Sequence, residues 1–156
     1  MIQEYFLNAL MALLQAEKQC LTHYKKMANK GVNAALIKAL HPQQTFCPEH
    51  VKRLKLIASM LPKTSFKKSE SAMPINLPKF AKRSASLTDL AILVNAVECE
   101  SVLLAHYKML KIICHSLLPD PAPELLAQSI AEHRQTSKWL RQLLQESILP
   151  PFLTNQ

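Results

Sequence analysis

The sequence contains very little glycine, and this scarcity excludes several classes of protein. Gly31 is the only glycine among 156 residues, so a glycine-rich phosphate-binding loop cannot form. The ten prolines lie mostly between or at the edges of apolar segments, instead of recurring at the short spacing that separates strands. The composition therefore favours an all-helical protein.

The cysteines show no pairing pattern. Cys20, Cys47, Cys99 and Cys114 lie far apart in the sequence, and none belongs to a Cys-x-x-Cys motif. The N-terminus has no basic segment of the kind that begins a secretory signal peptide. We therefore expect reduced thiols and a cytoplasmic protein.

Long hydrophobic runs are also missing. The longest uncharged apolar run, around residues 90–97, is far shorter than the ~20 residues that a membrane-spanning helix needs. We therefore expect a protein that does not associate with a membrane. A chain of 156 residues can bury one sizeable core without further support, which predicts a single domain over residues 1–156.

Acidic residues are scarce in one part of the chain. The formal net charge is +8, and between residues 52 and 83 the basic residues are opposed by Glu70 alone. The members of this basic belt are Lys52, Arg53, Lys55, Lys63, Lys67, Lys68, Lys79, Lys82 and Arg83. Such a belt could attract nucleic acid, anionic lipid or an acidic partner. Only Phe66 and Phe80 could stack on bases, so we predict weak, non-specific anion or nucleic-acid binding at most.

Apolar residues at helical spacing are the main feature that is present. Residues 2–29 are predicted to form the first helix, because Phe6, Leu10 and Tyr24 belong to a stripe with three- and four-residue spacing. Gly31 follows it and is expected to end the helix in a left-handed C-cap. The second helix is predicted over residues 33–61, where Pro42 and Pro48 must kink or split it.

Two more helices follow a long connection. Residues 62–85, rich in Pro, Ser and Lys, are expected to form a linker without regular structure. The third helix is predicted over residues 86–118, with Ser86 and Asp89 arranged as in a capping box. The fourth is predicted over residues 121–147, with Asp120 as N-cap and Pro121 at the first helical position. Two helical hairpins joined by one long crossover form a ferritin-like antiparallel four-helix bundle.

Several ionisable residues interrupt the apolar stripes that should face the core. Glu17 lies on the apolar face of the first helix, and Glu100 lies among apolar residues of the third. An unpaired buried carboxylate is costly, so each needs a metal ion, a base or a proton. We predict that Glu17 and Glu100 face each other across the centre of the bundle. The candidates that would compensate them are a metal ion, a shared proton, or His50 and His133 as cationic or hydrogen-bonding neighbours.

This distribution is one that a bundle uses to hold a di-iron or di-manganese centre. A full centre takes a Glu from each of two helices and a Glu-x-x-His from each of the other two, but Cys47 and Ile130 precede His50 and His133 by three residues. Two alternatives follow: a metal site, or a metal-free network of hydrogen bonds and ion pairs. The candidate metal ligands are Glu17, Glu49, His50, Glu100, Glu132 and His133.

The order of these segments resembles a known family. Residues 16–19, 49–54, 67–73, 97–107 and 125–140 are similar, in order and spacing, to the YciE/YciF-like family of ferritin-like bacterial proteins. The resemblance implies a stress-associated bundle, similar to bacterioferritin-type bundles, that forms dimers and has no firmly assigned reaction. By position it assigns Glu17, Glu49 or His50, Glu100 and Glu132 to the ligand-like positions. Phe46 and Leu103 stand where the family usually has further carboxylates.

The functional hypothesis is a stress-associated bundle protein with a degraded di-metal site and no robust catalysis. One alternative is a functional iron- or manganese-binding protein with oxygen or peroxide chemistry. Another is a basic scaffold or DNA-shielding protein. The third helix is apolar on nearly all sides, so we also predict a homodimer, with Ser101, Leu103 and Ala105 as candidates for the contact.

Overall fold

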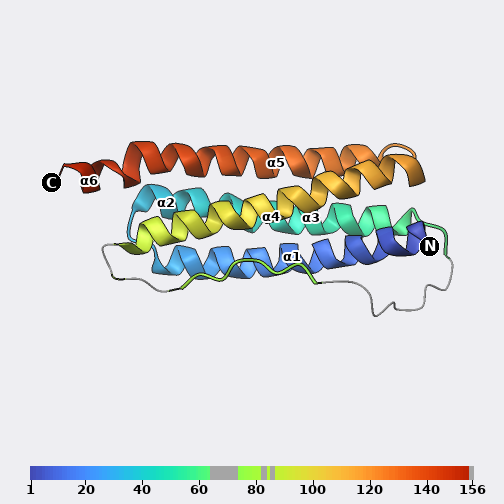
Figure 1. Cartoon of the computed structure of the whole chain (residues 1–156), viewed down its shortest axis with the longest axis horizontal. Coiled ribbons are helices and arrows are strands. Elements are labelled where there is room, and N and C mark those ends of the chain that lie inside the picture. Colours follow the sequence, from blue (N-terminus) through green and yellow to red (C-terminus); the bar gives the residue numbers. More distant parts are fainter. Residues whose placement is uncertain (64–73, 82–83, 85–86, 155–156) are drawn as a thin grey trace.

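The computed structural model describes residues 1–63, 74–81, 84 and 87–154, without the side chains of residues 42–44, and places the long helices side by side (Figure 1). The helices are α1 (Ile2–Lys30), α2 (Ala34–Leu40), α3 (Pro42–Ser59), α4 (Thr88–Leu117), α5 (Ala122–Leu143), the π-helical turn η2 (Leu144–Ile148) and α6 (Pro150–Leu153).

The chain order gives two antiparallel hairpins. α3 returns beside α1, and α5 returns beside α4 (Figure 1). Of the connection between α3 and α4, the described residues 74–81 run beside α1 (Figure 1). The fold is therefore the predicted all-α antiparallel bundle with one long crossover.

The second predicted helix is divided. α2 ends at Leu40 and α3 begins at Pro42, because proline has no backbone N–H and its ring crowds the preceding turn. Pro42 instead occupies the start of α3, where a missing N–H costs nothing. Pro48 remains inside α3 without ending it.

Two predicted helix caps, at Gly31 and at Asp120, are wrong in detail. Gly31 has φ −69° and ψ 150°, an extended conformation that any residue can adopt. It therefore does not form the predicted left-handed C-cap. α5 begins at Ala122 with Pro121 as its N-cap, so Asp120 does not cap it. Asp89 accepts hydrogen bonds from the backbone N–H groups of Val32 (2.8 Å) and Asn33 (2.9 Å), before α2. Ser86 lies outside the described residues.

The core lies along the common axis of the long helices, where their apolar faces meet. Leu103 of α4 is fully buried in it, so the prediction that this residue contributes to a dimer contact is wrong. The linker adds Ile75 and Leu77 to the core. It is held there because the side-chain amide of Asn95 donates to the Pro78 carbonyl at 3.0 Å. Among the described helices none is long and apolar enough to cross a bilayer.

Candidate metal centre in the bundle core

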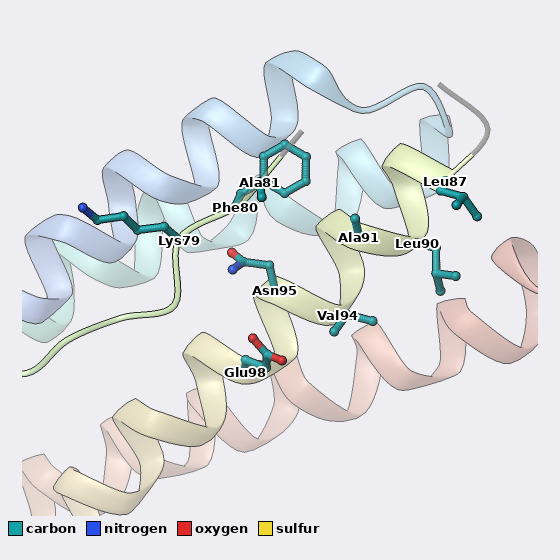
Figure 2. Close-up of a pocket in the computed structure, with 9 residues that line it drawn as sticks. All are labelled: Lys79, Phe80, Ala81, Leu87, Leu90, Ala91, Val94, Asn95 and Glu98. Atoms are coloured by element: carbon teal, nitrogen blue, oxygen red, sulfur yellow. The ribbon is translucent and has the colours of Figure 1, made fainter. Parts of the chain in front are cut away.

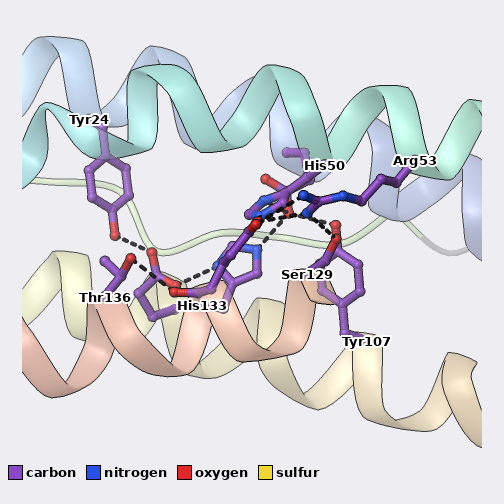
Figure 3. A network of polar contacts seen from close by, with 10 residues as sticks. Tyr24, His50, Arg53, Tyr107, Ser129, His133 and Thr136 are labelled. Atoms are coloured by element: carbon purple, nitrogen blue, oxygen red, sulfur yellow. Dashed lines mark hydrogen bonds and ion pairs between the residues drawn. The ribbon is translucent and has the colours of Figure 1, made fainter. Parts of the chain in front are cut away.

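Each long helix places one ionisable side chain at the same level of the core. They are Glu17 on α1, His50 on α3, Glu100 on α4 and His133 on α5, and all four are 0% exposed. Each lies on the stripe of its helix that faces the bundle axis, which is why the helical period buries it. Figure 3 shows His50 and His133 meeting between the helices. Their ring centroids are 4.4 Å apart.

His133 joins the two carboxylates. Its Nε2 lies 2.7 Å from Glu17 Oε1, and its Nδ1 lies 2.5 Å from Glu100 Oε2. Both nitrogens donate when the imidazole is protonated. This arrangement confirms the prediction that Glu17 and Glu100 face each other across the bundle, and His133 is the candidate that contacts both of them.

Two buried phenols complete the carboxylate contacts. The Tyr24 hydroxyl donates to Glu100 Oε1 at 2.6 Å, and the Tyr107 hydroxyl donates to Glu17 Oε1 at 2.7 Å. Each tyrosine follows a cluster carboxylate of its own helix by seven residues, which is two helical turns, and contacts the carboxylate of the other helix. Burial and the neighbouring carboxylates raise the pKa of both phenols well above the usual value.

His50 connects this group to an ion pair nearer the surface. Its Nε2 lies 2.7 Å from Glu132 Oε2. Arg53 holds the same carboxylate with both terminal nitrogens, Nη1 at 2.7 Å from Oε2 and Nη2 at 2.9 Å from Oε1. Arg53 Nη1 also donates to Ser129 Oγ at 3.2 Å. The bidentate contact fixes Glu132, and Glu132 in turn fixes the ring of His50.

Two polar atoms at the centre remain without a hydrogen bond. Glu17 Oε2 and His50 Nδ1 are buried and have no hydrogen-bond partner among the described residues. His50 Nδ1 lies 3.1 Å from Glu17 Oε1, a distance suited to an ion pair, but it is not aligned for a hydrogen bond. Ligand atoms of Glu17, His50 and His133 all lie within 4.8 Å of one another, so this buried group could hold a metal ion.

The charged side chains at the centre lower the pKa of the carboxylates of Glu17 and Glu132 and raise the pKa of His133. Burial alone would raise the pKa of Glu17, but the charge and hydrogen bond of His133 and the nearby charge of His50 outweigh burial and hold that pKa far below its usual value. Burial alone would lower the pKa of His133, but Glu100 and Glu17 raise it well above its usual value. Burial would raise the pKa of Glu132, but Arg53 and His50 lower it.

The predicted ligand residues separate into two groups. Glu17, His50, Glu100 and His133 come together in the core, while Glu132 is partly exposed and reaches His50 from the side. Glu49 points away from the cluster: its side chain is 46% exposed and pairs with Lys52 at 2.9 Å.

Phe46 and Leu103 stand at the two positions where the family resemblance implies further carboxylates. Phe46 stacks on the His50 ring with centroids 6.3 Å apart, and Leu103 is fully buried.

Sequence reasoning missed the role of Tyr24, Tyr107 and Arg53. The signal was present, because each tyrosine stands seven residues after a buried glutamate and Arg53 stands three residues after His50. These spacings place side chains on the same face of a helix. What the sequence does not contain is the pairing between helices, in which each phenol crosses to the other carboxylate.

A hollow of about 360 Å³ lies elsewhere, between the linker and the first half of α4 (Figure 2). Lys79 and Phe80 of the linker and Val94, Asn95 and Glu98 of α4 are among its lining residues. No residue of the core cluster lines it, so it is separate from the candidate metal centre.

Comparisons with known proteins give a family and a fold. The model of a family described as a domain of unknown function (DUF892) matches residues 1–150. Among solved structures, the E. coli stress protein YciF is similar, with a TM-score of 0.75 and 19% identity over 92% of this chain and 94% of that chain. YcfI from Rhodopseudomonas palustris is also similar, with a TM-score of 0.72 and 18% identity over 90% and 93%. No curated protein matches the chain.

Proposed function

The chain belongs to the DUF892 family, and from this premise we propose that it is a stress-associated bundle protein whose core binds one divalent metal ion instead of two. The family match and the likeness to YciF confirm the YciE/YciF-like resemblance of the sequence. The stress association is inferred from the description of YciF as a stress protein.

The observation that carries the proposal is the orientation of the two histidines. The inner nitrogens, His50 Nδ1 and His133 Nε2, both face Glu17 Oε1, at 3.1 and 2.7 Å. The outer nitrogens contact the carboxylates of Glu132 and Glu100. Histidines that bind metals commonly donate their second N–H to a carboxylate, which fixes the tautomer and the ring orientation. Both histidines of this cluster have such a carboxylate.

The donor set indicates the class of metal. Two imidazoles and one carboxylate suit Fe²⁺, Mn²⁺ or Zn²⁺. The unpartnered Glu17 Oε2 and His50 Nδ1 are atoms that a cation would satisfy, so the residues fit such an ion. A bound divalent ion would supply positive charge at the centre and, in the case of iron or manganese, redox chemistry. Glu100 and Glu132 would then each hold the proton on the outer nitrogen of one histidine.

A second ion lacks ligands. Glu100 is occupied by His133 and Tyr24, and Glu132 is occupied by Arg53 and His50. The positions three residues before His50 and His133 hold Cys47 and Ile130, both buried, where a two-metal centre would have carboxylates. These substitutions support a site reduced to one ion.

The burial of the site supports binding without robust catalysis. Glu17, His50 and His133 are 0% exposed, so a substrate reaches them only if the helices separate. Cys20, Cys47, Cys99 and Cys114 are all buried and form no disulfide with one another, which supports a reducing, cytoplasmic setting.

One observation favours a metal-free alternative. Protonated His133 can donate to Glu17 and Glu100 at once, and this contact compensates both carboxylates without an ion. In that case the cluster would be a structural network, and the protein a non-enzymatic scaffold.

Metal content of defined variants separates these alternatives. We would purify the protein without added metal, titrate Fe²⁺, Mn²⁺ and Zn²⁺ separately, remove loosely bound ions by gel filtration and measure the elements retained. We expect about one ion per chain and a rise in melting temperature on binding. Glu17→Gln and His50→Gln should abolish both effects.

Glu49→Gln is the matched control, because it removes a predicted ligand that lies outside the cluster. It should retain the ion. Retention of about two ions per chain would show that a two-metal centre survives, and absence of retained metal in the unmodified protein would favour the metal-free network.

A further inference from the structure

A groove between α4 and α5 is lined by positive side chains. It consists of two adjoining hollows, of about 370 and 340 Å³, that share Arg134. The cations that line this α4/α5 groove are Lys108, Lys111, Arg134, Lys138 and Arg141.

These charges are not neutralised locally. No Asp or Glu is among the described residues that line the two hollows, and none of the five cations forms an ion pair with a described residue. The basic belt differs, because Lys52 pairs with Glu49 and Arg53 pairs with Glu132. Lys67, Lys68, Lys82 and Arg83 of the belt lie outside the described residues.

The charges follow a line and do not converge on one point. Arg134, Lys138 and Arg141 recur after four and three residues on one face of α5, a span of about 10 Å along the helix axis. The α5 and η2 residues that line the groove extend from Ala127 to Gln145, about 27 Å at the same rise. A single phosphate would contact only one or two of these cations, so the groove fits an elongated polyanion.

We propose that the α4/α5 groove binds the phosphate backbone of a nucleic-acid duplex without reading its sequence. A duplex presents one negative charge per ~1.7 Å of its axis, a regular array that a row of Lys and Arg can neutralise. No aromatic side chain is among the described lining residues, so the groove has no platform on which single-stranded bases stack. Gln142 and Gln145 at one end add neutral donors for phosphate oxygens. This binding does not depend on the core cluster.

Fluorescence anisotropy with labelled 30-base-pair duplexes tests the proposal, using two unrelated DNA sequences and an RNA duplex of one of them. We expect equal affinity for the two DNA sequences and a steep loss of affinity between 50 and 200 mM salt. The triple variant Arg134→Gln, Lys138→Gln, Arg141→Gln should bind at least about tenfold more weakly at 50 mM salt, and its salt slope should fall by about 2 to 3.

A matched variant controls for net charge. Lys55→Gln, Lys63→Gln, Lys79→Gln removes the same number of charges from exposed residues of the basic belt and should keep most of the affinity. A variant with Arg134→Lys and Arg141→Lys keeps the charges and should also bind. Retained binding in this variant would show that the duplex requires the positive charge at these positions and not the guanidinium group itself.

Three results would overturn the proposal. The first is no measurable binding of any duplex at 50 mM salt. The second is an equal loss in the groove and belt variants, which would indicate attraction by net charge alone. The third is tighter binding of a labelled poly-glutamate peptide of matched charge, which would assign the groove to an acidic protein.

Discussion

His133 contacts two buried carboxylates at once. Its contacts with Glu17 and Glu100 are 2.7 and 2.5 Å long, and all three side chains are 0% exposed. Removing the imidazole would leave both carboxylates facing each other in the core. Breaking one partner of a buried ion pair costs more than the pair contributes, because the remaining charge is uncompensated.

We therefore predict that His133→Ala lowers the free energy of unfolding by about 3 to 5 kcal/mol in chelator-treated protein. His106→Ala, which changes an exposed histidine of α4, should change it by less than about 0.5 kcal/mol. Urea unfolding followed by circular dichroism measures both. Adding Glu17→Gln and Glu100→Gln to His133→Ala should recover part of the loss. A further loss would show that the carboxylates do not repel each other in the variant.

The ion pair between Glu17 and His133 makes the stability of the metal-free protein depend on pH. The pKa of Glu17 is lowered from 4.5, so its contribution is present above pH 4.5 and is lost as the pH falls. The pKa of His133 is raised from 6.5, so its contribution is present below pH 6.5 and is lost as the pH rises toward the folded-state value. The metal-free protein should therefore be most stable between these two values. Urea unfolding across pH 4 to 9 in chelator checks this, and stability that climbs steadily to pH 9 would contradict it.

The cysteine thiols should react only when the fold opens. Burial raises the pKa of Cys114 to about 11, and burial with the charges of Glu100 and Glu98 raises the pKa of Cys99 to about 12. The thiolate is the reactive form, so the thiols of the folded protein should react slowly with a disulfide reagent at pH 8. In urea, all of the thiols should react. Rapid labelling of any cysteine in the folded protein would place it outside the described core.

Among the helices, a contact at the start of α4 joins the second hairpin to the first. The Asp89 carboxylate accepts both backbone N–H groups that precede α2, and the Asn33 side chain caps α2 by accepting from the Leu36 N–H at 3.0 Å. A helix of seven residues is too short to be stable by itself. The position of α2 therefore depends on these contacts and on its buried apolar face.

We predict that Asp89→Ala lowers the free energy of unfolding by about 1 to 2 kcal/mol. Asp120→Ala is the comparison, because Asp120 is exposed and caps no helix, and it should be nearly neutral. Thermal unfolding of the two variants side by side provides the measurement. Equal losses would mean that Asp120 has a stabilising contact that its position before α5 does not reveal.

At the scale of the whole molecule, α4 leaves apolar side chains uncovered. Val94 is 46% exposed and Met109 62%, and the small residues Ser101 and Ala105 are exposed between them. Because a self-complementary patch is the usual basis of a two-fold dimer, we propose that a second copy of the chain covers this face.

Met109→Glu should therefore shift the protein from dimer to monomer in light scattering at micromolar concentration. Met11→Glu is the matched control, since it places the same charge on a comparably exposed methionine of α1, and it should leave the dimer intact. A monomeric mass for the unmodified chain would contradict the proposed contact.

The helices, the order in which they are connected and the positions of the buried charged residues could be predicted from the amino-acid sequence. Apolar spacing along one helix indicates which face is buried, and this sufficed to place Glu17, Glu100, His50 and His133 inward. It could not determine contacts between helices, because these depend on the rotation and level at which separate helices pack.

Three contacts depend on how the helices pack and were not predictable: both histidines direct one nitrogen at Glu17, Arg53 holds Glu132, and Glu49 faces solvent. The positive α4/α5 groove was missed for the same reason. Its cations are spread from Lys108 to Arg141 in the sequence, and they meet only because α5 folds back along α4.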